Sequence, residues 1–281
     1  MRCGFVLPGG SATQQLALAE LADQTGWDGL FVWEAAFGID AWSLLAAMAV
    51  RTERIRLGTL LTPLPWRRPW KVASQLATLD QLSQGRAILA VGLGAVDPLL
   101  GATGEVTDRR ERAQRLDEGL DIIDALFGGE RNYDGAHFHL NVPRNDLLAP
   151  AASVQRPRPP IWVVGAWPRP RSMARVLRVD GLLPNTVDEN GPRPPTLAEV
   201  AQMQAWLNQH STPGRTYERI VEGETPGQDP AADRATVAGW EAAGATWWIE
   251  ARWSGDPHSQ AQLDAVRARL AAGPPKTSGT D

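Results

Sequence analysis

Short β-prone segments alternate with longer helical segments along nearly the whole chain, and this alternation limits the fold more than any other feature of the sequence. Eight segments have the composition of strands, and each is followed by a segment with helical periodicity. The predicted strands span residues 3–8, 28–33, 54–60, 86–93, 160–164, 181–184, 217–223 and 245–253. The pattern favours an α/β fold, and eight repeats favour a closed (β/α)8 TIM barrel over an open doubly wound sheet.

Residues at the predicted helix starts match helix-capping chemistry, which supports this interpretation. Ser11 with Gln14 and Thr196 with Glu199 each fit a capping box, in which the two side chains satisfy free backbone N–H groups. The last helix is predicted to begin at Pro257, because proline suits the first position of a helix. No G-x-G-x-x-G follows the first strand, so the sequence does not favour a dinucleotide-binding Rossmann fold.

A length of 281 residues suits one barrel domain, predicted over residues 1–272. The alternation lapses over residues 130–160, between the fourth helix and the fifth strand, and this insertion is predicted to contain a hairpin at 133–140 and is a candidate lid. Residues 273–281 are rich in glycine and proline and are predicted to be a disordered tail.

The charge and cysteine content limit the partners and the compartment. A formal net charge of −4 gives no electrostatic reason to expect a nucleic acid or an anionic membrane as partner. Cys3 is the single cysteine, so the chain has no disulfide framework and no multi-thiolate metal site. With no apolar run of about 18 residues and no signal-peptide pattern, a cytoplasmic protein acting on a small molecule is predicted.

In a barrel the chemistry lies at the carboxyl ends of the strands, and several reaction classes lack their residues there. None of these ends carries a lysine for a Schiff base or a histidine for a metal site. No serine or cysteine nucleophile stands in an elbow beside a base. The sequence therefore predicts no metal and no nucleophilic catalysis at the barrel mouth.

Tryptophan is the residue type that does stand at these ends, at Trp33, Trp66, Trp167 and Trp253. These rings either wall a pocket for a flat ligand or simply cap the barrel. A pocket with few acids, bases or nucleophiles and room for a planar ring indicates that a bound cofactor carries the chemistry.

Residues 163–172 pass from a strand into Gly165, Ala166, Trp167 and two arginines, Arg169 and Arg171, separated by prolines. If the strand ends at Gly165, the backbone N–H groups that follow and the two guanidinium groups form a cradle for a phosphate. The alternative is a proline-rich turn with solvated arginines.

Several segments in series resemble the bacterial luciferase-like flavin-dependent oxidoreductases. They are WDGLFVWE at 27–34, TERIRLGT at 52–59, TLDQLSQGR at 78–86, GLG at 92–94, LDEGL at 116–120, PIWVVG at 160–165 and DGLLP at 180–184. The resemblance covers residues 1–186, and beyond them only the order of elements is similar.

This resemblance implies a barrel, usually dimeric, that binds reduced FMN or the deazaflavin coenzyme F420, in some members with a separate flavin reductase as partner. It implies a ring site with a distorted peptide at Thr59, Leu60, Leu61 and Thr62, and close approach of the ring at Gly92 and Gly94. It implies that the cofactor phosphate lies against Gly165, Ala166 and Trp167, with Arg169 and Arg171 as its charge partners.

The chain departs from the family pattern at two positions. The family commonly has an acidic residue followed by histidine after the second strand, whereas this chain has Glu34 followed by Ala35. Many members have an arginine at the end of the fourth strand, where this chain has Ala95. Glu34 is the candidate for proton transfer, although a carboxylate that orients hydrogen-bond donors is an equal interpretation. Candidate substrate contacts, beside Trp33, Trp66 and Trp253, are Arg67, Glu222, Glu250 and Arg252.

Four hypotheses follow. The leading one is an FMN-dependent oxidoreductase or monooxygenase acting on a small organic substrate. The alternatives are an F420-dependent hydride-transfer enzyme, a non-catalytic flavin-binding protein, and a cofactor-free isomerase that uses Glu34, Glu222 or Glu250.

Overall fold

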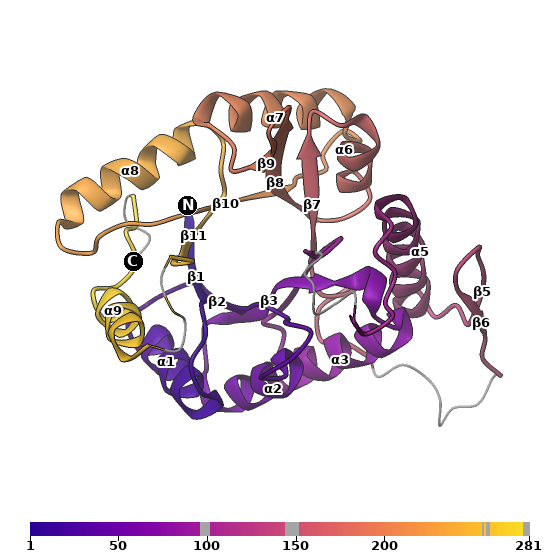
Figure 1. The fold of residues 1–281 in the computed structure, drawn as a ribbon, viewed down its shortest axis with the longest axis horizontal. Helices are drawn as coiled ribbons and strands as arrows, with labels where there is room; N and C mark the ends of the chain where they lie inside the picture. The colour runs from indigo at the N-terminus through magenta and orange to yellow at the C-terminus, as the bar shows by residue number, and fades with distance from the viewer. Residues whose placement is uncertain (96–101, 144–151, 255, 257–258, 278–281) are drawn as a thin grey trace.

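The computed structural model describes residues 1–95, 102–143, 152–254, 256 and 259–277, and its centre is a closed barrel of eight parallel strands (Figure 1). The strands pair in the order β10-β11-β1-β2-β3-β4-β7-β8, and β8 pairs with β10 to close the ring. The barrel strands are β1 (Arg2–Leu7), β2 (Gly29–Val32), β3 (Arg56–Pro63), β4 (Ala87–Gly92), β7 (Ile161–Trp167), β8 (Gly181–Asp188), β10 (Glu218–Gly223) and β11 (Trp247–Ala251). The predicted TIM barrel is confirmed.

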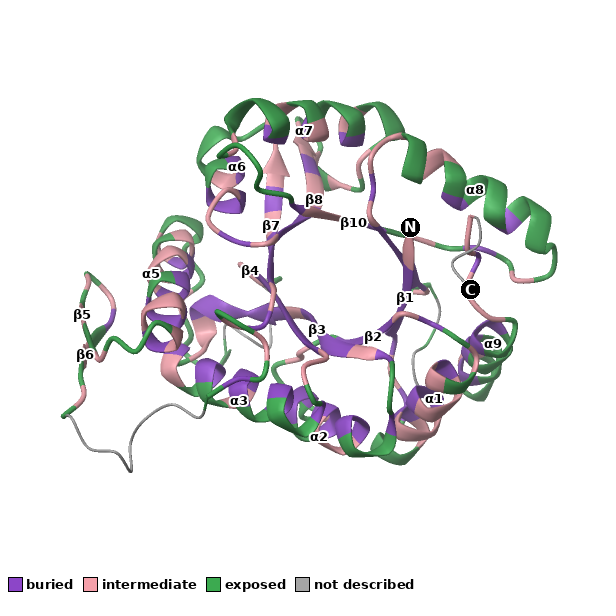
Figure 2. Ribbon diagram, turned by 180° about the vertical axis from the view of Figure 1, so that it is seen from behind, coloured by how far each residue is buried: buried purple, intermediate pink, exposed green. Residues whose placement is uncertain are grey.

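Helices surround the barrel, with their buried residues turned toward the strands and their exposed residues toward solvent (Figure 2). They are α1 (Ala12–Gln24), α2 (Ala41–Arg51), α3 (Pro69–Leu82), α5 (Arg109–Phe127), α6 (Pro170–Val176), α7 (Leu197–His210), α8 (Pro230–Ala242) and α9 (Gln260–Ala271), with a short 3-10 turn at Leu64–Trp66. The capping boxes predicted at Ser11 and Thr196 are both present. Because each helix begins beside the carboxyl end of the preceding strand, its first turn lies at the barrel mouth.

Three aromatic rings fill the barrel interior below the mouth. Trp162 lies 5.3 Å from both Phe31 and Trp247, measured between ring centroids, and Phe31 and Trp247 are 6.0 Å apart. A Cβ at position 181 would stand 2.3 Å from Trp162 Cδ1, so glycine is needed at Gly181 for this ring to fit. All three rings are buried, and any ligand at the mouth rests above them.

The described residues of the insertion include the hairpin of β5 (Asn132–Asp134) and β6 (His139–Asn141), which lies on the outer side of α5 (Figure 1), and residues 152–160, where the Gln155 N–H donates to Asp80 of α3 at 2.9 Å. Both oxygens of Glu118 on α5 accept hydrogen bonds from backbone N–H groups of the hairpin turn, at Ala136, His137 and Phe138. The Phe138 ring packs edge-on against Trp70. The described residues of the insertion therefore do not cover the barrel mouth as a lid would.

The structure corrects three boundaries. β7 and β8 extend beyond Gly165 and Pro184, because the two strands keep pairing as far as Trp167 and Thr186, and β8 then folds back on β9 (Gly191–Arg193). The last helix begins at Gln260 with Ser259 as its N-cap, whereas Pro257 lies outside the described residues.

The C-terminal tail also differs from its prediction as a disordered segment. Residues 273–277 follow the barrel surface, where Lys276 lies 3.2 Å from Asp28 and the Thr277 hydroxyl donates to Glu241 at 2.5 Å. These contacts order a glycine- and proline-rich segment that composition alone marks as free. Residues 278–281 lie outside the described part of the chain.

Candidate functional site

A cavity of about 960 Å³ opens at the barrel mouth, between the carboxyl ends of β2, β3, β4, β7 and β8 and the first turns of α5 and α6. Its volume suits a drug-sized ligand or cofactor. Nine of the predicted site residues line it: Trp33, Glu34, Leu60, Leu61, Trp66, Gly94, Ala166, Arg169 and Arg171. Its β3 side is mostly apolar and its α5 and α6 side is cationic, and the two sides meet where the Arg112 guanidinium lies 5.7 Å from the centroid of the Trp66 ring.

One end is apolar and is walled by β3 and the segment after β4. Leu60 and Leu61 line it, and the peptide bond between them is cis, so the distorted peptide that the family resemblance implies in this strand is present. The Trp66 indole lies beside Gly94, where a Cβ would come within 2.5 Å of the ring. Gly94 has a φ of 76°, which also favours glycine. The absence of a side chain at Gly94 lets the Trp66 ring pack against the backbone there.

The other end is cationic. Five arginines line it: Arg109 and Arg112 from the first turn of α5, Arg169 at the N-cap of α6, and Arg171 and Arg175 within α6. Two of them are held by the protein. Arg175 donates to both carboxylate oxygens of Asp117 at 2.6 and 2.9 Å, and Arg112 donates to the carbonyl groups of Leu93 and Gly94.

Three of these arginines, Arg109, Arg169 and Arg171, are exposed, and their guanidinium groups make no hydrogen bond or ion pair with another described residue. Arg112 is buried and pairs with no carboxylate of the described residues; desolvation and the neighbouring charge of Arg109 lower its pKa. Guanidinium groups left unpaired around one end of a cavity produce a positive potential that an anionic ligand relieves. The geometry therefore fits a ligand with an apolar ring system and an anionic side chain.

The backbone cradle predicted after Gly165 is wrong in its details. Gly165 belongs to β7, and a Cβ there would stand 2.3 Å from Leu182 Cδ1 and 3.1 Å from Met173 Sδ, so this glycine allows packing and not the approach of an anion. The Ala166 N–H donates to Ser172 Oγ at 2.9 Å and is not free. Side chains, above all the arginines, are thus what this segment offers an anion.

Glu34 lines the cavity with both carboxylate oxygens engaged. Oε2 accepts from the Thr62 hydroxyl at 2.7 Å and from Trp42 Nε1 at 3.1 Å, and Oε1 pairs with Arg67. Its side chain is only 7% exposed. These contacts favour the interpretation in which Glu34 orients its neighbours, since Thr62, Trp42 and Arg67 already engage both of its oxygens.

Five predicted residues support the cavity from behind without lining it. Thr59 and Thr62 are buried and face Glu34, Arg67 extends from Glu34 to Gln75, and Trp167 follows Ala166 at the end of β7. Gly92 allows Leu61 and Val164 to approach the end of β4, since a Cβ there would lie 3.0 Å from both.

Glu222 and Trp253 stand outside this cavity at the ends of β10 and β11, where Trp253 Nε1 donates to Glu222 Oε2 at 3.1 Å. Glu222 is open to solvent, but the surrounding protein desolvates its carboxylate and raises its pKa. Among the predicted substrate contacts, Trp33 and Trp66 line the cavity, whereas Glu222 and Trp253 follow β10 and β11 beside it.

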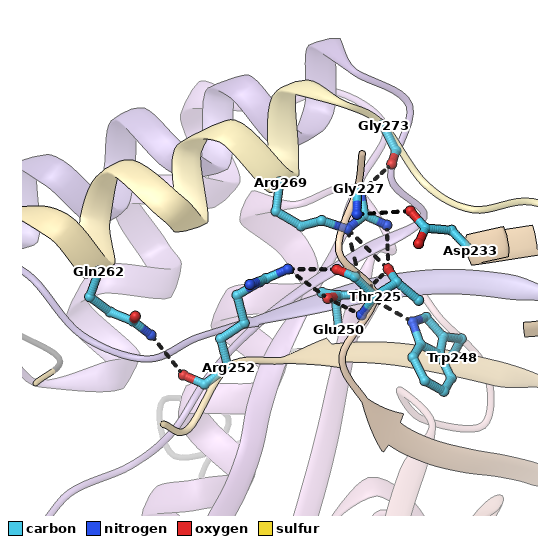
Figure 3. Close-up of polar contacts among 9 residues, drawn as sticks. All are labelled: Thr225, Gly227, Asp233, Trp248, Glu250, Arg252, Gln262, Arg269 and Gly273. Atoms are coloured by element: carbon cyan, nitrogen blue, oxygen red, sulfur yellow. Dashed lines mark hydrogen bonds and ion pairs between the residues drawn. The ribbon is translucent and has the colours of Figure 1, made fainter. Parts of the chain in front are cut away.

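Glu250 and Arg252 belong to a buried cluster behind the barrel wall (Figure 3). Glu250 Oε1 accepts from the Thr225 N–H and Oε2 from the Thr225 hydroxyl, both at 2.7 Å. Arg252 donates to the Thr225 carbonyl at 2.6 Å, and Arg269 donates to the Thr225 hydroxyl at 2.8 Å. Glu250 is fully buried and does not line the cavity, so these contacts assign it to holding β10, β11 and α9 together.

The sequence analysis did not identify Arg109, Arg112, Ser172 or Arg175 as site residues. A signal was present, because the first turn of a helix in a barrel lies at the mouth, and Asp108, a residue type that favours the N-cap, places Arg109 and Arg112 in such a first turn. Arg175 gives no such signal, since its orientation depends on Asp117.

In the described part of the chain, no group of three or more histidine, cysteine, aspartate or glutamate residues is arranged to hold a metal ion. Among the same residues, no helix has the length and apolarity to cross a membrane.

The sequence profile of the luciferase-like monooxygenases matches residues 2–202. The chain belongs to this family. Two curated relatives are the uncharacterized protein y4wF of Sinorhizobium fredii (strain NBRC 101917 / NGR234), 36% identical over 165 residues, and the 4-hydroxyprotoasukamycin monooxygenase of Streptomyces nodosus subsp. asukaensis, 40% identical over 128 residues. These matches cover 56% and 44% of this chain, and 46% and 34% of the relatives. The luciferase-like chain thus spans less than half the length of either relative.

Solved structures confirm the fold over almost the whole chain. Monooxygenase RslO1 from Streptomyces bottropensis has a TM-score of 0.76 at 20% identity and covers 97% of this chain and 98% of its own. An F420-dependent secondary alcohol dehydrogenase has a TM-score of 0.73 at 17% identity, covering 96% and 98%. The oxygenating constituent of 3,6-diketocamphane monooxygenase from a Pseudomonas putida plasmid, in complex with FMN, has a TM-score of 0.66 at 21% identity, covering 84% and 71%. The predicted family and the predicted TIM-barrel fold are both confirmed.

Proposed function

We propose that this luciferase-like chain is a monooxygenase that uses reduced FMN and molecular oxygen on a small organic substrate. The observation that carries the proposal is the polarity of the cavity, which joins an apolar, tryptophan-walled end to an end with three unpaired arginines. Among the relatives and neighbours, two are named monooxygenases and a third is a monooxygenase in complex with FMN.

The residues present fit this cofactor. Leu60, Leu61 and Trp66 offer apolar surface to a planar ring system, and Arg169 and Arg171 offer guanidinium groups to a phosphate. When bound, a reduced flavin supplies the electrons that activate oxygen. The role of the chain is to bind the flavin, to orient it and to exclude water from its ring.

Arg112 provides a positive charge near Ala95, where many members of the family have an arginine. The family resemblance implies an arginine at the end of the fourth strand, and this chain has alanine there. The Arg112 guanidinium comes from α5 instead and donates to the carbonyl groups of Leu93 at 3.1 Å and Gly94 at 2.9 Å, directly before Ala95. A cation is therefore available at this strand end although the strand does not carry it.

Titrating the purified chain with FMN and with riboflavin, which lacks the phosphate, tests the proposal. We expect FMN to bind at micromolar concentration and riboflavin to bind about tenfold or more weakly, because only FMN meets the arginines. Consumption of oxygen by the complex with reduced FMN should follow. Failure of both flavins to bind would overturn the proposal, and tight FMN binding without reaction with oxygen or any hydride acceptor would favour a flavin-binding protein.

One observation favours coenzyme F420 as a second candidate. The cationic end holds more unpaired arginines than one phosphate requires, and the side chain of F420 carries carboxylates beyond its phosphate. Competition between F420 and FMN for the chain separates the two cofactors, since displacement of FMN by substoichiometric F420 would favour hydride transfer over oxygenation.

A further inference from the structure

The rim of the barrel at β10 and β11 carries a carboxylate, Glu222, whose place in the fold points it toward the mouth. Ile220 lies in the hydrophobic cluster inside the barrel, and alternate residues of a strand share a face. Glu222 therefore faces the interior one step nearer the mouth. In the same way, Ile249 and Ala251 of β11 lie in the interior cluster and place Trp253 on this face.

Two exposed tryptophans flank the end of β1 next to this carboxylate. Val6 pairs with Ala251 on β11 and Leu7 pairs with Val32 on β2, so Trp253 and Trp33 follow the two strands that flank β1. Trp33 Nε1 donates to the carbonyl of Pro8, directly after β1, at 3.3 Å. Trp33 is 45% exposed and Trp253 is 50% exposed, whereas Trp162 and Trp247 inside the barrel are buried.

Glu222 has unused capacity to accept a hydrogen bond. Trp253 Nε1 donates to Oε2 at 3.1 Å, and Oε1 has no partner among the described residues. No lysine, arginine or histidine of the described chain pairs with it, and the surrounding protein desolvates the carboxylate. A partly desolvated carboxylate oxygen of this kind favours a hydrogen-bond donor and disfavours a second anion, and the five arginines that line the cavity disfavour a cation.

The two ends of the mouth therefore differ in the charge that they accept. The arginines after β7 and in α5 offer positive charge to an anion, whereas the rim at β10 and β11 presents a carboxylate that contacts the exposed indole ring of Trp253. A substrate with its own carboxylate or phosphate would be repelled by Glu222 and would compete with the cofactor for the arginines. An uncharged aromatic molecule with a donor group meets neither penalty.

From this arrangement we infer that Glu222, Trp33 and Trp253 form the substrate subsite, which binds an uncharged aromatic ring bearing a hydroxyl or amino donor. The rings of Trp33 and Trp253 contact the aromatic body, and Glu222 accepts from the donor. The inference rests on the proposed function, since it places the substrate beside the bound flavin. It assigns to Glu222 the selection of substrate and not the chemistry on the flavin.

Equilibrium dialysis of the FMN-loaded protein against 2-naphthol and against 2-methoxynaphthalene tests this assignment. The two probes share the same ring, and only the naphthol has a donor. We expect the wild type to bind the naphthol about tenfold more tightly than the ether, which is the effect of one hydrogen bond to a charged acceptor. Glu222→Leu should abolish this preference, and Glu222→Gln should restore part of it, because the amide keeps an accepting oxygen.

Glu130→Gln is the matched control, since it removes the same charge at the opposite end of the barrel, after α5, and should keep the preference. A merely structural role for Glu222 would weaken both probes equally and would show no recovery in Glu222→Gln. Equal binding of both probes by the wild type would overturn the inference even if Glu222→Leu fails to fold, and so would a full preference in Glu222→Leu.

The same dialysis separates this inference from the proposed function. Retention of FMN by the protein is read from its visible absorbance in each chamber. If no variant and no wild-type sample retains FMN, the proposed function fails. If FMN is retained and the naphthol preference does not depend on Glu222, the cofactor assignment stands and only the substrate subsite is wrong.

Discussion

Two groups of arginines at opposite sides of the barrel show how the same side chain serves different ends. After β7 and in the first turn of α5, Arg109, Arg169 and Arg171 line a cavity without a partner among the described residues. Behind β10 and β11, Arg252 and Arg269 surround Glu250, which is fully buried. The guanidinium groups of the first set can therefore bind an anionic ligand, whereas those of the second set are paired with a carboxylate of the same chain.

The second group of arginines lies beside the ends of β10 and β11, the seventh and eighth strands of the barrel. In many barrels, phosphate binds at the loops after the seventh and eighth strands, which in this chain are β10 and β11. Here the Glu250 carboxylate accepts hydrogen bonds from the N–H and the hydroxyl of Thr225, the kind of donors that a phosphate would use (Figure 3). The carboxylate of Glu250 thus occupies the hydrogen-bond donors of Thr225, directly after β10. The arginines without a partner among the described residues are on the other side of the mouth.

Glu250→Gln should produce the largest effect, on stability. The substitution keeps the shape of the side chain but leaves Arg269, only 3% exposed, without its carboxylate. Breaking a buried ion pair from one side costs about 3–5 kcal/mol, so the free energy of unfolding in urea should fall by this amount. The exposed Glu130→Gln should stay within about 0.5 kcal/mol of the wild type.

FMN affinity of the folded Glu250→Gln protein should be nearly unchanged, because Glu250 does not line the cavity. If the variant keeps its stability but loses FMN, the distinction between the two groups of arginines is wrong.

The double substitution Arg169→Ala with Arg171→Ala should have the opposite profile. Two charge-assisted contacts to the phosphate are lost, and we expect FMN to bind about a hundredfold more weakly while riboflavin is little affected. The free energy of unfolding should change by no more than about 0.5 kcal/mol, since both side chains are exposed and unpaired. Fluorescence titration with each flavin and urea unfolding give the two quantities.

Arg234→Ala with Arg267→Ala is the matched control, because it removes two exposed charges from α8 and α9 on the other side of the barrel. FMN affinity equal to that of the wild type is expected. A similar loss in both double variants would mean that net charge, and not the cavity, attracts the phosphate.

The difference between the two groups also marks the limit of what the sequence could predict. The barrel followed from alternation and capping boxes, which are local features, and Arg169 and Arg171 followed from their place after the fifth strand. Whether an arginine is free depends on residues far away in the sequence, and Asp117 for Arg175 lies 58 positions away. Glu250 could be placed at a strand end, but the side of the strand that it faces depends on packing against α9.

The glycine in the fifth strand illustrates the same limit. Its position before two arginines suggested a close approach of phosphate to the backbone, and the structure shows instead that Leu182 and Met173 occupy the space beside it. A glycine that admits a ligand and a glycine that admits a neighbouring side chain are identical in the sequence. Only the tertiary contacts distinguish them.

Gly165→Ala sharpens the comparison because it acts on the support of the unpaired arginines. A Cβ at this position would lie 2.3 Å from Leu182 Cδ1 on β8 and 3.1 Å from Met173 Sδ on α6, so the packing of both elements against β7 must change. Overpacking of this kind costs about 1–3 kcal/mol, and FMN binding should weaken together with stability. The flavin titration and urea unfolding used for the arginine variants measure both, and loss of FMN at unchanged stability would restore the predicted close approach of phosphate to Gly165.

The smallest expected effect is that of ionic strength, which should change FMN binding by the exposed arginines more than the stability provided by the buried ones. Arg169 and Arg171 are exposed, so raising the ionic strength from about 0.05 M to about 0.5 M screens their attraction for phosphate and should weaken FMN binding several-fold. Glu250 and Arg269 are buried, and their contact is screened much less. The stability lost in Glu250→Gln, measured against the wild type at each ionic strength, should therefore stay constant within about 0.5 kcal/mol. Riboflavin controls for effects of salt on the ring site, and an equal salt dependence of both flavins would show that no exposed cation meets the phosphate.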